Sequence, residues 1–307
     1  MSGNQLRPLT PKLALLAHEE LNETPDRIQQ DLIILRVWIH QQSHLKARTT
    51  DDFLIAFLRR SRYSLEETKK RIDTYFSFYK IFPEILANRC VTERVLEINR
   101  MGVHYYPEFP KSDNQSALLI ARFGCYDPKK YNLREMLQFI TMAIEIMALE
   151  SDNAAIAGLC QVIDFAGMTF EHFLQFDNVI YKKWWAWLED CCPLKIKEIF
   201  IINSPKEIGF IQFHINLLEV HIYTVLKSTE DLYKYIPKKC LPEEYGGHNG
   251  HIGECIAYME DLLRSYRNYF AEDSQYGTCE ELRSGDIIPY EAEFGVSGSF
   301  RKLSNVE

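Results

Sequence analysis

The spacing of apolar residues changes near position 100, and this change constrains the fold more than any other feature of the chain. Three short apolar runs follow, at residues 117–122, 157–165 and 199–202. Runs that are apolar on both faces are typical of strands in a parallel sheet covered by helices. Helical patterns separate the runs, at residues 132–149 and 170–189. This alternation predicts an α/β domain with a mostly parallel sheet.

Before this change, residues 1–95 have helical patterns almost throughout. Thr10 and Thr24 each stand directly before a proline, which is typical of a helix cap followed by the first helical residue. Ser64 with Glu67 three residues later predicts a capping box, and Pro83 ends the helix that it opens. The pattern therefore predicts a small all-helical N-terminal domain.

The stretch that begins at Ser204 predicts a helix of unusual composition. A cap, a proline and Glu207 open it, and apolar residues from 208 to 226 cover its whole circumference. Such a helix is buried on all sides, crosses a membrane or covers something apolar. Polar residues such as Gln212 and His214 interrupt it. We therefore expect either a core helix or a lid.

Composition and charge argue against several classes of protein. The net charge is −8 and the pI is near 5.7, whereas a general nucleic-acid binder needs a basic face. The eight cysteines form no C-x-x-C pair, so neither a zinc ribbon nor a thioredoxin-type motif is indicated. No uncharged apolar stretch reaches 18 residues, and we find no export signal. We expect a cytoplasmic protein with reduced thiols.

Motifs for catalysis are scarce, since we find no G-x-S-x-G, Walker loop or H-E-x-x-H. Residues 246–251 (GGHNGH) could hold a phosphate or a metal, but a plain turn is the better interpretation because no strand precedes them and no third ligand is near. Asp164 is interpreted as a hydrogen-bonding residue at a strand end. Cys191 and Cys192 are interpreted as buried thiols. We expect neither an enzyme nor a bound metal or cofactor.

A tryptophan cluster precedes one basic spot. Trp184, Trp185 and Trp187 are followed by Lys195 and Lys197, which are two residues apart and so share a face of an extended segment. The spacing is compatible with a solvated strand edge. It is equally compatible with contact to an anionic lipid headgroup.

Six motifs occur in a characteristic order: DFLIAFLRRSR at residues 52–62, CYDP at 125–128, VIDFAG at 162–167, PLKIK at 193–197, IINSP at 201–205 and LPEEYGG at 241–247. Their order resembles the CRAL-TRIO family of Sec14-like lipid-binding proteins. Within it, the chain is most similar to the group of the alpha-tocopherol transfer protein and the cellular retinaldehyde-binding protein. Each motif is weak alone, but six in family order over residues 25–250 are specific.

The resemblance implies a helical domain at residues 1–95 and a lipid-binding domain at 96–250, followed by a C-terminal helix and tail at 251–307. Residues 271–307 contain eight acidic and three basic residues, so we expect most of them to form an extended acidic tail. The resemblance further implies a hydrophobic pocket, with the helix from Ser204 as its lid. The implied pocket residues are Phe139, Ala143, Ile146, Leu159, Ile163, Phe165, Trp187, Leu188, Ile199, Ile208, Ile211 and Ile215. The implied contacts to a phosphoinositide or membrane are Lys195, Lys197 and Lys227. Two further basic positions of the relatives are Ile222 and Leu226 here, so full phosphoinositide exchange is not implied.

The resemblance also implies a function, namely the intracellular binding and transfer of a retinoid, tocopherol, carotenoid or similar isoprenoid lipid, with release at membranes. The alternative is a regulatory or interaction protein that a phosphoinositide or sterol controls. Thr141, Tyr181 and Tyr223 could supply a polar contact to the ligand. We expect a cytoplasmic monomer that contacts anionic membranes transiently and binds no nucleic acid.

Overall fold

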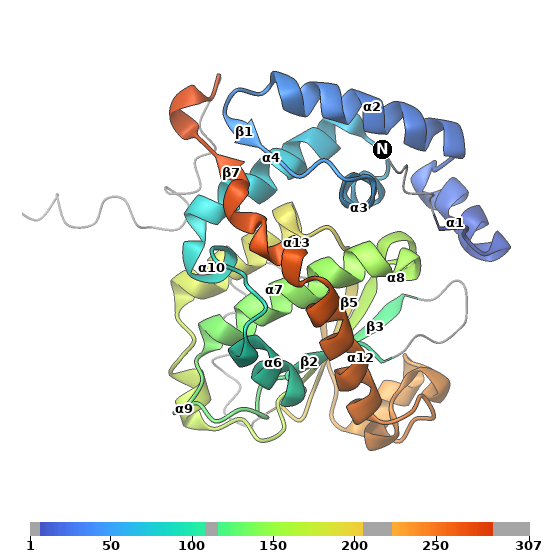
Figure 1. The fold of residues 1–307 in the computed structure, drawn as a ribbon. Coiled ribbons are helices and arrows are strands. Elements are labelled where there is room, and N and C mark those ends of the chain that lie inside the picture. Colours follow the sequence, from blue (N-terminus) through green and yellow to red (C-terminus); the bar gives the residue numbers. More distant parts are fainter. Residues whose placement is uncertain (1–6, 108–115, 205–222, 285–307) are drawn as a thin grey trace, which may run out of the picture.

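The computed structural model describes residues 7–107, 116–204 and 223–284. The N-terminal helices lie against one end of a second part, which contains the main sheet and the helices that cover it (Figure 1). The helices near the C-terminus run across both parts (Figure 1).

The N-terminal part is helical, as predicted. The described helices are α1 (Pro11–Leu21), α2 (Pro25–Gln41), α3 (Asp51–Arg60), α4 (Leu65–Ile81), α5 (Pro83–Leu86) and α6 (Glu93–Arg100). The side chains of Thr10, Thr24 and Ser64 each accept a hydrogen bond from the backbone N–H three residues later. These caps satisfy N–H groups that have no partner inside the helix, which is why the helix starts could be predicted locally.

The main sheet has the strand order β2-β3-β4-β5-β6. Its strands are β2 (His104–Tyr105), β3 (Ala117–Arg122), β4 (Leu159–Asp164), β5 (Ile196–Ile202) and β6 (Tyr223–Val225). Strands β3 to β6 pair in parallel, and β2 pairs antiparallel with β3 at one edge. The predicted mostly parallel α/β sheet is confirmed. The two edge strands were not predicted, because two or three residues are too few to show a period.

Helices and turns cover both faces of this sheet. The helices on the chain between β3 and β5 are α7 (Leu133–Glu150), α8 (Asp152–Ala157), α9 (Phe170–Phe173), α10 (Asn178–Ala186) and a π-helix at Trp187–Cys191. Side chains of α7 pack against one sheet face. The other face packs against α12 (Ile252–Ser265) and 3₁₀ turns at Thr229–Lys234, Lys238–Cys240 and Glu243–Tyr245. The helix expected over 170–189 is divided, because Asp177 caps a new helix at α10.

Residues 271–284 correct the expectation of an extended acidic tail. After α13 (Arg267–Ala271), they form short 3₁₀ turns at Asp273–Gln275 and Glu280–Leu282, with the strand β7 (Gly277–Thr278) between them. Strand β7 pairs antiparallel with β1 (Leu45–Lys46). The Asp273 carboxylate is buried against Arg89, and Arg283 forms an ion pair with Asp73 on α4. The segment docks because its charged groups find partners of opposite sign in distant parts of the chain.

The helix expected from Ser204 to Leu226 is wrong at its end, because Tyr223–Val225 form the edge strand β6, which pairs with β5; the rest of the expected lid lies outside the described residues. Ile208, Ile211, Ile215 and Ile222 lie in residues 205–222, outside the described ranges, as does the rest of the acidic tail at 285–307. Within the described ranges, no helix is both long enough and apolar enough to cross a lipid bilayer.

Candidate ligand-binding cavity

A cavity with a mainly apolar lining lies between α7, the sheet and the segment that carries α9 and α10. The cavity measures about 120 Å³ and is partly open; the whole hollow, including space open to solvent, measures about 1180 Å³. Helix α7, strands β4 to β6, and the aromatic residues of α9 and α10 each supply one wall. The cavity therefore lies inside the α/β part of the chain, on the α7 side of the sheet.

Helix α7 presents Leu133, Leu137, Ile140 and Ile144 to the cavity. Their spacing of four, three and four residues places them on one face of the helix.

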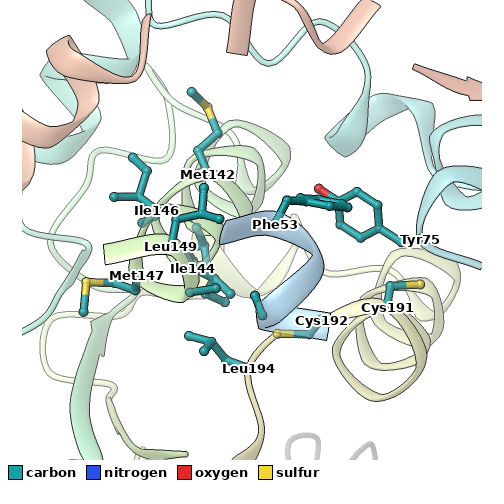
Figure 2. Packing of buried hydrophobic residues seen from close by; sticks show 14 of the residues in the cluster. Phe53, Tyr75, Met142, Ile144, Ile146, Met147, Leu149, Cys191, Cys192 and Leu194 are labelled. Carbon is teal, nitrogen blue, oxygen red and sulfur yellow. The ribbon is translucent and has the colours of Figure 1, made fainter. Parts of the chain in front are cut away.

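The expected contacts from α7 were Phe139, Ala143 and Ile146. Phe139 and Ala143 each stand one residue before a lining residue, so they point toward a different side of the helix. All three are fully buried in the main core, and none of them lines the cavity. Figure 2 shows Ile146 in the buried cluster with Phe53 and Cys192. Helix α7 is buried on every side, so its apolar pattern did not indicate which face meets the cavity.

On the strands, side chains alternate between the two faces of the sheet, so residues two apart point to the same side. Ile163 on β4, Phe165 just after it, and Ile199 on β5 all line the cavity, as expected. Leu159 is fully buried in the main core, and the cavity lining does not include it.

Aromatic side chains form the wall opposite the sheet. Trp184 and Trp185 on α10 line the cavity, together with Phe173 and Phe176. Leu188 also lines it, as expected, whereas Trp187 is 1% exposed and packs in the core with its ring 5.3 Å from that of Trp184. The cluster of tryptophans could have indicated this wall, but consecutive positions on a helix do not reveal which ring points inward.

A few polar groups face the cavity. Tyr181 and Tyr223 line it, and burial raises the pKa of Tyr181 to about 12, so its hydroxyl stays protonated at neutral pH. Thr141 does not line the cavity. Its hydroxyl donates a hydrogen bond to the Gln138 carbonyl oxygen at 2.7 Å. Gln161 on β4 was not expected in the site, although it is the one polar residue in the middle of an apolar strand run.

A basic cluster lies where the N-terminal helices meet the α/β part. It comprises Arg60 and Arg62 near the end of α3, and Lys195 and Lys197 at the start of β5. Burial and the nearby positive charges of Arg62, Arg60 and Lys197 lower the pKa of Lys195. The Glu20 carboxylate, 3.8 Å from the Lys197 amine, offsets part of the positive charge of the cluster. The two lysines are exposed, so the cluster offers positive charge to an anion in solvent.

Lys227 lies apart from this cluster. Strands β5 and β6 run parallel with Ile201 opposite Val225, so Lys227 follows the carboxyl end of the pair. By the same register, Lys227 would lie opposite residue 203. Lys195 stands eight residues before that position, just before the amino end of β5. At about 3.3 Å per residue, the two ends are separated by roughly 26 Å. The three lysines therefore do not form one contact site.

Comparison with known proteins agrees with this architecture. A model of the CRAL/TRIO domain matches residues 99–247, and a model of a Pinta-like UBA domain matches residues 24–95. The chain contains a CRAL/TRIO domain. Proteins with this domain bind hydrophobic molecules and in general transfer lipids; they are not in general enzymes.

Curated relatives cover nearly the same length of chain. The alpha-tocopherol transfer protein-like protein of Pongo abelii is 23% identical over an alignment of 307 positions, which covers 94% of this chain and 88% of that protein. Clavesin-1 of Xenopus laevis is 23% identical over 257 residues, which cover 78% and 74% of the two chains. The solved structure of Sfh5 is 12% identical, with a TM-score of 0.42 over 84% of this chain and 99% of that one.

In the CRAL/TRIO domain, Asp164 has a structural role. Its carboxylate accepts hydrogen bonds from the Tyr245 hydroxyl at 2.6 Å and from the Asn203 amide at 2.8 Å. Tyr245 directly precedes Gly246, whose φ of +68° suits a turn. The strand end is thus tied to the glycine turn, which confirms the structural interpretation of both.

The cysteine pair of the domain is also buried, as expected. Cys191 and Cys192 are free thiols, and burial raises the pKa of Cys192 to about 11. Among the residues that the structure describes, no group of histidine, cysteine or acidic side chains is arranged to hold a metal ion.

A second cavity, of about 520 Å³, lies between α1, α2, α3 and the end of α7. It is larger than the first cavity, but its charged groups are paired with one another. Arg59 donates to Glu23 at 2.8 Å and to Asp152 at 2.6 Å, and Arg7 is 3.2 Å from Asp152. The first cavity fits an apolar ligand better, because few ionic groups there need to stay hydrated.

Proposed function

We propose that this protein binds a small hydrophobic lipid, such as a retinoid, tocopherol, carotenoid or other isoprenoid, and transfers it between membranes. The observation that supports this most directly is the apolar cavity between α7 and the sheet, inside a domain whose relatives bind lipids. Residues 205–222 would then form the lid. The proposal keeps the division at residues 1–95, 96–250 and 251–307, and a monomeric carrier without cofactor.

The energetics of such binding are favourable. Burying about 400 Å² of apolar ligand surface at roughly 25 cal/mol per Å² contributes about 10 kcal/mol before the costs of association. The cavity of 120 Å³ is too small for a ligand of this size, whose pocket measures roughly 300–1,000 Å³, whereas the whole hollow of 1180 Å³ is ample. A ligand of this size therefore requires the cavity to widen.

Release at a membrane is supported by two exposed features. Phe170 and Leu174 are 74% and 68% exposed, and they flank Phe173, which lines the cavity. Exposed apolar side chains beside a lipid cavity suit insertion into the membrane interface. Lys195 and Lys197 would add attraction to anionic lipid, worth about 1 kcal/mol for each lysine near the surface, but at the amino end of β5, whereas α9 follows the carboxyl end of the parallel strand β4.

The basic cluster also supports the second candidate function, a protein whose partner binding is controlled by a phosphoinositide or sterol. The cluster joins α3 of the N-terminal part to β5 of the CRAL/TRIO domain, so an anion there would touch both parts. Removing residues 285–307 discriminates the two, because this cut spares the docked segment at 271–284. Loss of partner binding with intact lipid transfer favours the second function.

The decisive experiment is mass spectrometry of lipids extracted from the protein after purification from its own tissue under native conditions. One stoichiometric retinoid, tocopherol or carotenoid supports a dedicated carrier and names its cargo. Mixed phospholipids or phosphoinositides support the second function. An empty extract, together with no binding to a panel of apolar ligands, refutes both.

A further inference from the structure

The cavity floor carries one amide among apolar neighbours. Gln161 lies in the middle of β4, opposite Leu119 on β3 and Ile199 on β5, and its side chain lines the cavity. Ile140 and Ile144 of α7 line the same space. Within residues 7–107, 116–204 and 223–284, no hydrogen bond joins this amide to another group. No group of the described residues thus competes for this amide with a molecule in the cavity.

An amide in such a place selects for a particular ligand chemistry. Its N–H groups donate and its oxygen accepts, so it can pair with a hydroxyl or a carbonyl group. A hydrocarbon would shield the amide from water without pairing it, and an unpaired buried polar group costs about 1–3 kcal/mol. Sites built around such a group reject analogues that lack the matching polar atom.

The charges around the cavity exclude a second class of ligand. Its described lining contains no lysine, arginine or histidine. The charged residue among these lining residues is Asp177, which accepts a hydrogen bond from the Ile180 N–H at 2.7 Å and lies 3.5 Å from Arg134. The Asp177 side chain is 50% exposed, so it stands at the mouth. Among the described lining residues, a ligand carboxylate on the floor would therefore meet no counter-ion, and burying it unpaired is costly.

We propose that Gln161 binds the polar end of a neutral apolar ligand that carries one alcohol, aldehyde or ketone group, and that the site discriminates against both the parent hydrocarbon and the carboxylic acid. This assignment rests on the proposed lipid-binding function. The ligand then lies with its oxygen on β4 and its hydrocarbon body toward the aromatic wall of α10.

The test compares three probes of one skeleton: retinol, its hydrocarbon analogue in which hydrogen replaces the hydroxyl, and retinoic acid. Binding is measured on the full chain by quenching of tryptophan fluorescence, since Trp184 and Trp185 line the cavity. The unaltered protein binds retinol most tightly. Gln161→Leu weakens retinol binding about 10- to 100-fold and tightens hydrocarbon binding by about fivefold or more, because no amide is then left unpaired beneath the hydrocarbon. Gln30→Leu, the same substitution at an exposed position on α2, leaves all three affinities unchanged.

Two results overturn the assignment of Gln161: an unchanged preference for retinol in Gln161→Leu, or an equal loss for all three probes in a variant that unfolds at the same temperature as the unaltered protein. Tightest binding of retinoic acid overturns the neutral class. Gln161→Met serves as a second variant of the same length if the leucine variant does not fold.

Failure of the underlying function gives a different result. Ile144→Trp fills the cavity and abolishes binding of every probe if the ligand lies there. If this variant binds the probes as the unaltered protein does, the cavity is not the binding site; if the unaltered protein binds neither these probes nor a tocopherol or a carotenoid, the proposed function itself is refuted.

Discussion

Replacing Arg89 with methionine is expected to destabilise this protein strongly, because Arg89 is fully buried and joins three separated parts of the chain. Its guanidinium donates to Glu145 on α7 at 2.7 Å and to Asp273 in the C-terminal segment at 3.0 Å. It also donates to the hydroxyls of Tyr75 and Tyr79 on α4, at 3.1 and 2.6 Å. Methionine preserves much of the length of the side chain but removes every one of these donors.

The expected loss of folding stability follows from the two carboxylates, Glu145 and Asp273, that the substitution leaves buried without Arg89. Two buried carboxylates lose their common cation, and removing one partner of a buried ion pair costs about 3–5 kcal/mol. That is a large share of the roughly 5–15 kcal/mol by which folded proteins are stable. Replacing Glu145 with glutamine and Asp273 with asparagine in the same chain removes the unpaired charges, so this triple variant is expected to regain at least half of the loss.

The assay is urea unfolding at pH 7.5, followed by circular dichroism, with Arg94→Met as the matched control. Arg94 forms an ion pair with Glu135 at 2.7 Å, but its side chain is 40% exposed, so its removal is expected to cost no more than about 1 kcal/mol. If Arg89→Met loses no more stability than Arg94→Met, the claim that this network holds the three parts together is refuted.

The same network predicts a pH dependence. Burial raises the pKa of Asp273 to about 6, although Arg89 opposes the shift, whereas the unfolded value is about 3.9. Between pH 4 and 6 the folded state therefore holds a proton that the unfolded state does not, and stability from this group is lost as the pH rises through 6. The cost of Arg89→Met is accordingly expected to be smaller at pH 5 than at pH 7.5. An equal cost at both pH values would contradict the assignment of the titration to Asp273.

Two further predictions concern the basic cluster and the glycine turn. Lys195→Glu combined with Lys197→Glu is expected to slow lipid transfer to anionic vesicles by at least tenfold, because each lysine contributes about 1 kcal/mol of attraction to the membrane. Lys227→Glu is expected to have little effect on transfer. Equal effects of the two variants would refute the separation of Lys227 from the basic cluster. Gly247→Ala is expected to destabilise the protein by about 1–3 kcal/mol in thermal unfolding, because a Cβ would overlap the Leu241 carbonyl oxygen. Gly253→Ala, in α12 with open space around it, is expected to stabilise by up to about 1 kcal/mol, and the same sign for both would contradict the reasoning.

Local signals in the sequence were enough to predict most of the fold. The caps at Thr10, Thr24 and Ser64 depend on side chains and backbone N–H groups three residues apart, so the sequence contains both partners. The runs that became β3, β4 and β5 are apolar on both faces because helices or turns cover both sides of the sheet. Their order indicated a mostly parallel sheet.

The site residues were predictable only where local geometry determines direction. Strand alternation indicated which residues of β4 and β5 share a face, and Ile163 and Ile199 do line the cavity. Helix α7 is surrounded by protein, so no polar stripe indicated its cavity face, and the expectation was one residue out of phase. The same alternation places Gln161 on the cavity floor, but its significance depends on the apolar side chains that the fold brings around it.

The sequence by itself therefore determined the helical start, the parallel sheet and the type of domain, because each follows from patterns within a few residues or from the order of motifs. The tertiary structure alone decided three other matters: the face of α7 that meets the cavity, the separation of Lys227 from Lys195, and the burial of Asp273 against Arg89. Each depends on contacts between residues far apart in the chain. Such contacts are set by strand register and by the balance between burial and ion pairing, neither of which leaves a local pattern in the sequence.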